Sequence, residues 1–226
     1  MRGPRAWLPH HLLGVVIAGG ESRRYGRPKA LALMGGKPMA LWALDALGPS
    51  FPLRGMVGSE LFVSRGFGVL SRPDLLPGLG PMGGLITGLE WAKEMSLGGV
   101  FLLGCDMPLI DAGLIKRILA FRGDRKAALV PASDGPLGME PLCAAYGMEC
   151  LGPARELTRS GPRSMMALLN AVDFDLLPLE ELGEPEEVNR VFTNVNTVED
   201  GKKVEAVLEA RREMATAEGS AGLETP

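Results

Sequence analysis

Short apolar segments that alternate with amphipathic ones constrain the fold of this chain more than any other feature. Three of them, Leu12–Ala18, Gly99–Gly104 and Lys126–Ala132, have the length and composition of strands buried on both faces. Helices are predicted over residues 38–47, 85–95, 111–121, 150–159 and 164–171 and from 197 onward, and shorter strands over 54–58, 67–71, 142–146 and 191–195. This alternation predicts an α/β fold with a mostly parallel sheet and helices on both faces.

The chain of 226 residues has no internal repeat and no linker that divides it. We expect an N-terminal extension over residues 1–13, a single domain over 14–212 and a disordered tail over 213–226. The acidic segment Glu180–Glu187 is predicted to be a solvated loop. Thr197 and Asp200 have the spacing of a capping box that opens the last helix.

Charge and composition exclude several classes of protein. With 24 basic and 27 acidic residues, the net charge of −3 provides no electrostatic footprint for a nucleic acid. No apolar run reaches the ~18 residues that span a bilayer, and the N-terminal segment is a poor match to a signal peptide. Three cysteines without a CxxC pair favour free thiols in a reducing compartment. We therefore expect a cytoplasmic protein without nucleic-acid or membrane partners.

Glycine is the outlier in composition, at 31 of 226 residues, and two loops are rich in it. The first loop follows the first predicted strand directly. Gly19 and Gly20 allow backbone amides to face a phosphate, and Arg23, Arg24 and Lys29 add positive charge, a combination suited to a triphosphate. The spacing matches neither a Walker loop nor a dinucleotide loop, so a solvated basic turn is the alternative interpretation.

The second glycine loop contains Gly78, Gly80 and Gly83 at the spacing of the dinucleotide fingerprint. However, no strand runs directly into Gly78, and Pro81 removes an amide that a pyrophosphate would use. We therefore do not expect a dehydrogenase. Two interpretations stay open: a tight turn that lets the next helix pack closely, or a loop that borders a base or ribose.

Asp106 follows the apolar strand Gly99–Gly104. Ligands of α/β sheets bind at the carboxyl ends of strands, and a carboxylate there suits Mg²⁺ together with substrate phosphates. An aspartate that caps a turn is the alternative. We expect Cys105 to be a small buried group rather than a nucleophile, because the only two histidines, His10 and His11, lie near the N-terminus.

Together these segments resemble the molybdenum cofactor guanylyltransferase family. The first loop is similar to that family's Leu-Ala-Gly-Gly-x-Ser-x-Arg signature, and the second loop to its Gly-Pro-Leu-Gly/Ala-Gly segment. Further matches begin at Gly36, Cys105, Glu140 and Phe192. The matches come in family order and extend from Gly14 to about Asp200.

The resemblance implies a Rossmann-like nucleotidyltransferase fold and the transfer of GMP from GTP to molybdopterin, or its molybdenum-loaded form, with release of pyrophosphate. It implies Mg²⁺ on Asp106 and a pterin side at Asn194 and Asn196. It implies GTP contacts at Ile17, Ala18, Gly19, Gly20, Lys29, Asp74 and Asp106.

Since no covalent nucleophile is evident, we expect the terminal phosphate of molybdopterin to attack the α-phosphorus of GTP directly. Lys29, Asp106 and Arg23 are the predicted catalytic residues, with Lys29 and Arg23 (or Arg24) stabilising the leaving pyrophosphate. Because a phosphate is already ionised at neutral pH, no general base is required.

Two alternatives stay open. The first is a CTP-dependent molybdopterin cytidylyltransferase, although the Gly19–Gly20 pair resembles the guanylyl enzymes more. The second is a non-enzymatic protein that delivers the nucleotide or molybdopterin. The expected protein partners are molybdopterin-insertion proteins and apo-molybdoenzymes.

Overall fold

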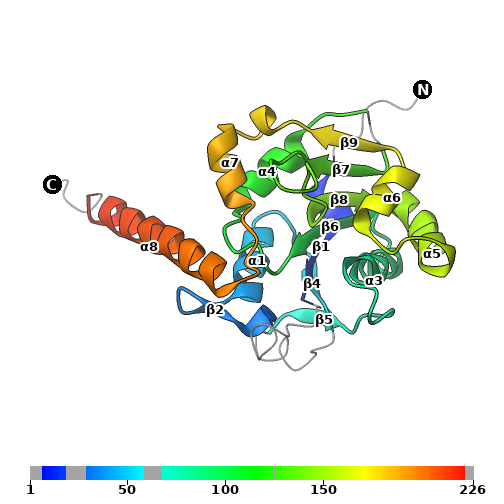
Figure 1. Cartoon of the computed structure of the whole chain (residues 1–226), viewed down its shortest axis with the longest axis horizontal. Helices are drawn as coiled ribbons and strands as arrows, with labels where there is room; N and C mark the ends of the chain where they lie inside the picture. Colours follow the sequence, from blue (N-terminus) through cyan, green and yellow to red (C-terminus); the bar gives the residue numbers. More distant parts are fainter. Residues whose placement is uncertain (1–6, 19–28, 59–67, 125, 222–226) are drawn as a thin grey trace.

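The apolar segments form one seven-stranded sheet in the computed structural model, which describes residues 7–18, 29–58, 68–124 and 126–221. The sheet has the order β5-β4-β1-β6-β8-β7-β9 (Figure 1). Its strands are β1 (Leu12–Ile17), β4 (Arg54–Val57), β5 (Leu70–Arg72), β6 (Gly99–Gly104), β7 (Ala128–Pro131), β8 (Cys143–Gly147) and β9 (Phe174–Leu177). A small hairpin consists of β2 (Leu33–Met34) and β3 (Lys37–Pro38).

Helices connect these strands. The α-helices are α1 (Met39–Leu47), α3 (Pro81–Glu94), α4 (Ala112–Ala120), α5 (Leu151–Ser160), α6 (Met165–Ala171), α7 (Pro185–Val191) and α8 (Val198–Ala221). Short 3₁₀ turns are η1 (Pro9–His11), η2 (Lys29–Leu31), η3 (Met148–Cys150) and η4 (Leu179–Glu181). Among the described residues, no helix is long and apolar enough to cross a membrane.

The order of the strands creates a switch point beside β1. From β1 the chain builds outward through β4 and β5 and then crosses back to β6, which pairs with β1 in parallel on its other side. Only β8 runs antiparallel, between β6 and β7, so the sheet is mostly parallel as predicted. Ile17 and Gly104 end β1 and β6 opposite each other. Open α/β sheets bind ligands at such a point, outside the carboxyl ends of the strands.

The predicted cover of helices on both faces is confirmed. Successive side chains of a strand point to opposite faces, and in β1 Leu12 and Val16 belong to the core that contains α1 and α4. Val15 and Ile17 belong to the core that contains α3, α5 and α6. Because both faces are covered, β1 and β6 are buried along their whole length, which explains their uninterrupted apolar sequences.

The helices α4 and α8 begin at capping side chains, at the positions where the sequence predicts these helices to start. The Asp111 carboxylate accepts a hydrogen bond from the backbone N–H of Leu114 (2.8 Å) at the start of α4. At α8, the Asp200 N–H donates to Thr197 Oγ1 (3.1 Å) and the Thr197 N–H donates to Asp200 Oδ2 (2.9 Å). The capping box is therefore confirmed, with aspartate in the role usually taken by glutamate.

Two predictions for the C-terminal third are wrong. The strand predicted over residues 191–195 does not form: Val191 ends α7, and Val195 packs against Met39 and Leu208 instead of pairing in a sheet. The segment Glu180–Glu187 contributes to η4 and α7 rather than forming a loop, although its acidic side chains are exposed as expected. Its apolar residue Leu182 packs inward, and this anchors the backbone.

The ends of the regular structure also differ from the expected boundaries. β1 begins at Leu12, inside the expected extension 1–13, because Leu12 and Leu13 already pair with Gly99 and Val100 of β6. At the other end, α8 continues to Ala221, past residue 212, through a sequence rich in the strong helix formers Ala, Glu and Arg. Figure 1 shows α8 projecting away from the sheet.

Candidate active site

Three polar side chains from distant parts of the chain meet at the carboxyl ends of β1 and β6. Lys29 Nζ donates to Asp106 Oδ2 (2.9 Å) and to Asn196 Oδ1 (2.8 Å). The Lys29 and Asp106 side chains are 22% and 21% exposed, so their ion pair is partly shielded yet open to a ligand. We call this the Lys29–Asp106–Asn196 cluster.

Each member of the cluster is held by a different element. Asp106 follows directly from β6, and Lys29 begins η2. The backbone N–H of Val195 donates to the Asp106 carbonyl (2.8 Å), which fixes the segment before α8 against the end of β6. The N–H of Asn196 donates to Asp200 Oδ2 (3.0 Å), so the capping box of α8 also orients Asn196. This hydrogen bond, with that of the Thr197 hydroxyl, lowers the pKa of Asp200 because both favour the charged carboxylate.

The first turns of α8 are anchored beside the cluster. Val204 and Leu208 are buried against Met34 and Leu109. Arg211 Nη1 donates to the Leu109 carbonyl (3.0 Å), three residues after Asp106. The docking of the last helix, α8, therefore holds the segment that contributes Asn196 to the site.

The second glycine loop leads to another part of the same sheet edge. A Cβ added to Gly84 would lie 2.8 Å from Ile17 Cδ1 and 3.1 Å from Ile17 Cγ1, so a larger residue would force Ile17 to shift, and glycine lets the first turn of α3 approach the end of β1 closely. The interpretation of a tight, closely packed turn is thus confirmed, and α3 directs the positive end of its dipole toward this edge. The preceding strand β5 ends at Arg72, well before Gly78, so the structural context of a dinucleotide fingerprint is absent from this loop.

The structure brings together some of the residues singled out in the sequence and separates others. Ile17 is buried and Ala18 half-buried at the end of β1. Asp74 lies on the α3 side, where its Oδ1 accepts from the Leu76 N–H (2.9 Å). Asn194 is half-buried in the segment before α8. Four predicted residues, Gly19, Gly20, Arg23 and Arg24, lie outside the described residues.

Glu140 is a further acidic group near the site that the sequence did not single out individually. Burial raises the pKa of Glu140, a hydrogen bond from Ser133 lowers it, and the negative charge of Asp106 raises it. Glu140 follows β7, and two residues later the Leu142 carbonyl accepts from the Gly104 N–H (2.8 Å) at the end of β6. In the sequence, only its place as the first residue of the matching segment 140–146 pointed to it.

The cluster has the donor chemistry that a magnesium ion requires. A carboxylate oxygen of Asp106 and an amide oxygen of Asn196 already converge on one cationic group, the ammonium of Lys29. Hard oxygen ligands of this kind, together with substrate phosphates, bind Mg²⁺ in many phosphoryl-transfer sites. The residues present therefore fit a divalent cation at Asp106.

Cys105 is next to Asp106 in the sequence, but its thiol is buried and unreactive. Its side chain is 6% exposed, and burial, assisted by the charge of Asp106, raises the pKa of the thiol to about 12. Cys143 and Cys150 are also buried and unpaired, as expected. All three thiols are therefore protonated at pH 8.

We expect the native protein to resist thiol-specific reagents at pH 8, because the thiolate fraction rises only as the pH approaches the raised pKa values. Titration with a chromogenic disulfide before and after denaturation measures this: none of the three thiols should react rapidly before denaturation, and all three after it. Cys105→Ser should keep nucleotidyl transfer. Rapid labelling of native Cys105 would contradict the assignment.

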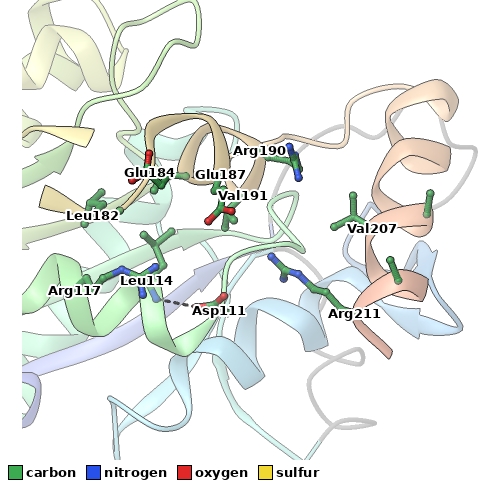
Figure 2. Close-up of a pocket in the computed structure, with 14 residues that line it drawn as sticks. Asp111, Leu114, Arg117, Leu182, Glu184, Glu187, Arg190, Val191, Val207 and Arg211 are labelled. Carbon is green, nitrogen blue, oxygen red and sulfur yellow. Dashed lines mark hydrogen bonds between the residues drawn. The ribbon is translucent and has the colours of Figure 1, made fainter. Parts of the chain in front are cut away.

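An open groove of about 790 Å³ lies outside the cluster, between α4, α7 and α8 (Figure 2). Arg190 of α7 and Arg211 of α8 face it together with Asp111, whose hydrogen bond to Leu114 is drawn there. Its walls carry acidic and basic side chains among apolar ones. None of the three cluster residues lines it.

Comparisons with known proteins agree with this geometry. Residues 14–174 match the family model of the MobA-like NTP transferase domain. The probable molybdenum cofactor guanylyltransferase of Thermococcus gammatolerans is 32% identical over 196 residues, which cover 84% of this chain and 96% of the relative. The molybdenum cofactor guanylyltransferase of Desulfosudis oleivorans is 30% identical over 202 residues, covering 88% and 96%.

A solved structure has the same fold. The molybdopterin-guanine dinucleotide biosynthesis protein A of Archaeoglobus fulgidus superposes with a TM-score of 0.70 at 22% identity, covering 88% of this chain and 100% of that one. The sheet and the site define a nucleotidyltransferase. The chain belongs to the MobA-like NTP transferase family, in which a divalent metal is typical, and the expected resemblance is confirmed.

Proposed function

We propose that this enzyme transfers GMP from GTP to molybdopterin, or to its molybdenum-loaded form, and releases pyrophosphate. The product is the molybdopterin guanine dinucleotide cofactor. The observation that carries the proposal is the Lys29–Asp106–Asn196 cluster at the switch point of the sheet, in a chain of this family.

The reaction is an in-line substitution at phosphorus. A terminal phosphate oxygen of molybdopterin forms a bond to the α-phosphorus of GTP, and the bond from that phosphorus to the oxygen bridging to the β-phosphate breaks. The leaving pyrophosphate takes the electron pair. Because the attacking phosphate is ionised at neutral pH, no residue has to remove a proton, which agrees with the inert thiol of Cys105.

Charge stabilisation is then the main task of the protein. Lys29 binds the triphosphate and stabilises the charge that develops on pyrophosphate, assisted by Arg23 and the amides of Gly19 and Gly20. Asp106 would hold a magnesium ion, which would supply further positive charge to the phosphate oxygens when bound.

The two substrates approach from different sides. The end of β1 at Ile17 and Ala18 and the loop that begins at Asp74 border GTP, since α3 packs closely against β1 there. Asn196 and Asn194 lie in the segment before α8 and border the pterin. We place the reaction in the cytoplasm, where free thiols persist, and molybdopterin-insertion proteins and apo-molybdoenzymes stay predicted as partners.

Product analysis tests the proposal. The purified protein is incubated with molybdopterin, Mg²⁺ and each of the four NTPs in turn, and the dinucleotide and pyrophosphate are quantified. We expect both products with GTP only. Products with CTP alone would identify a cytidylyltransferase, and nucleotide binding without any product would identify a delivery protein.

A further inference from the structure

Thr87 is a buried polar residue in the middle of the otherwise apolar inner face of α3. Its side chain is 0% exposed. The hydroxyl accepts from the Leu75 N–H (2.9 Å) and lies 2.9 Å from the Gly83 carbonyl and 3.1 Å from Asp74 Oδ1. A helical threonine commonly satisfies itself with the carbonyl four residues earlier, so the additional contacts to residues 74 and 75 tie a separate segment to the helix.

The Asp74 carboxylate completes this tie from the loop side. Its Oδ1 accepts from the Leu76 N–H (2.9 Å) as well as contacting Thr87. A Cβ added to Gly83 would lie 2.8 Å from Asp74 Oδ2 and 2.6 Å from the Leu76 carbonyl, so the absence of a side chain at Gly83 leaves space for the carboxylate and the loop backbone. Asp74 is thus packed onto the first turn of α3.

The loop Pro77–Gly80 lies between this tie and the start of α3 at Pro81. Gly78 and Gly80 have φ angles of +84° and +57°, and no atom lies within 4 Å of the position of a Cβ at either residue. The backbone of the loop is therefore open to its surroundings. At its two ends it is held by the Thr87–Asp74 network and by the helix.

We propose that Thr87 is a positioning residue for the nucleotide. With Asp74, Thr87 holds the loop Pro77–Gly80 in the shape that borders the base or ribose of GTP. This inference rests on the proposed function, which places GTP beside α3. It assigns a role to a fully buried hydroxyl between α3 and the loop.

The first test separates positioning from general stability. Thr87→Val keeps the shape of the side chain and removes the hydroxyl, and Thr87→Ser restores it. We expect Thr87→Val to raise the KM for GTP about tenfold, with kcat and the KM for molybdopterin changed less than about twofold. Thr87→Ser should return the KM to near the wild-type value. The matched control is Thr158→Val on α5, where the hydroxyl also donates to a carbonyl of its own helix (2.7 Å).

Amide hydrogen exchange reports on the loop independently of turnover. The Leu75 and Leu76 amides should exchange about tenfold faster in Thr87→Val and at the wild-type rate in Thr158→Val. Faster exchange with an unchanged KM for GTP would overturn the positioning role. A fall in kcat with a rise in both KM values would overturn it as well, since that pattern indicates a general disturbance of the active site.

Calorimetric binding of GTP without molybdopterin keeps this inference distinct from the proposed function. If the wild-type protein binds GTP but forms no dinucleotide, the proposed function fails, and the Kd for GTP of Thr87→Val still tests the role of Thr87. An unchanged Kd would overturn that role.

The last test concerns Asp74. Because Asp74 and Thr87 contact each other, their effects on the KM for GTP should not multiply. We expect the double variant Asp74→Asn/Thr87→Val to be no worse than the more impaired single variant. If the two effects multiplied, Asp74 and Thr87 would act independently of each other, and the shared positioning network would be overturned.

Discussion

Asp106→Ala is expected to lower the kcat of guanylyl transfer by about 10²–10³-fold while the protein stays folded. The side chain provides the one carboxylate of the Lys29–Asp106–Asn196 cluster, and with it the predicted anchor for Mg²⁺ and the triphosphate. The backbone carbonyl of Asp106, which accepts from the Val195 N–H, is unaffected by the substitution, so the segment before α8 should stay in place. Steady-state kinetics at several Mg²⁺ concentrations, together with circular dichroism, measure the two effects.

Asp45→Ala is the matched control for Asp106→Ala. Asp45 also pairs with a lysine, Lys37, but it lies on α1 and is 66% exposed. Exposed pairs of this kind contribute about 0–1 kcal/mol to stability, so the control should change neither activity nor folding appreciably. Turnover of Asp106→Ala close to the wild-type value would remove Asp106 from the site.

The second large effect is expected for Lys29→Met, which keeps the apolar stem and removes the charge. We expect kcat/KM for GTP to fall by about 10²-fold, because the triphosphate and the leaving pyrophosphate lose a cation positioned next to Asp106. Lys29→Arg should recover only part of this loss, since a guanidinium does not reproduce the compact geometry of an ammonium. Kinetics with varied GTP and quantified pyrophosphate measure the change.

Lys37→Met is the control for Lys29→Met. Lys37 likewise pairs with an aspartate and also lies 4.3 Å from the centroid of the Trp42 ring, but its contacts are made on α1. It should lose a little stability and no activity. If Lys29→Met and Lys37→Met had equal kinetics, Lys29 would have no role in binding the triphosphate.

The central strands were predictable because their environment is uniform. β1 and β6 lie between two layers of helices, so every residue is buried and the sequence is continuously apolar. β9 escaped prediction for the opposite reason. It lies at the edge of the sheet, Leu176 is 46% exposed, and its buried polar residue, Asp175, accepts from the Asp124 N–H (3.3 Å).

The false strand over residues 191–195 shows the limit of local patterns. Val191, Phe192 and Val195 favour a strand by composition, but Val191 and Phe192 lie at the end of α7 and pack into the core that contains α4, and Val195 packs into the core that contains α8. An apolar run in a sequence indicates that the segment is buried. It does not indicate whether the segment is a helix or a strand, or which kind of element packs over it.

The sequence by itself determined the class of fold, the two glycine loops and Lys29 and Asp106 as candidates, because each belongs to a short local pattern, whereas Asn196 was a candidate only through the family resemblance. Only the tertiary structure decided that these three side chains touch: Lys29 is separated from Asp106 by 77 positions and from Asn196 by 167. It also showed that Thr87 hydrogen-bonds to the start of the second loop. A single threonine in an apolar helix does not indicate such a contact in the sequence. Contacts of this kind depend on how strands are ordered and helices are docked, and distance along the chain does not encode that order.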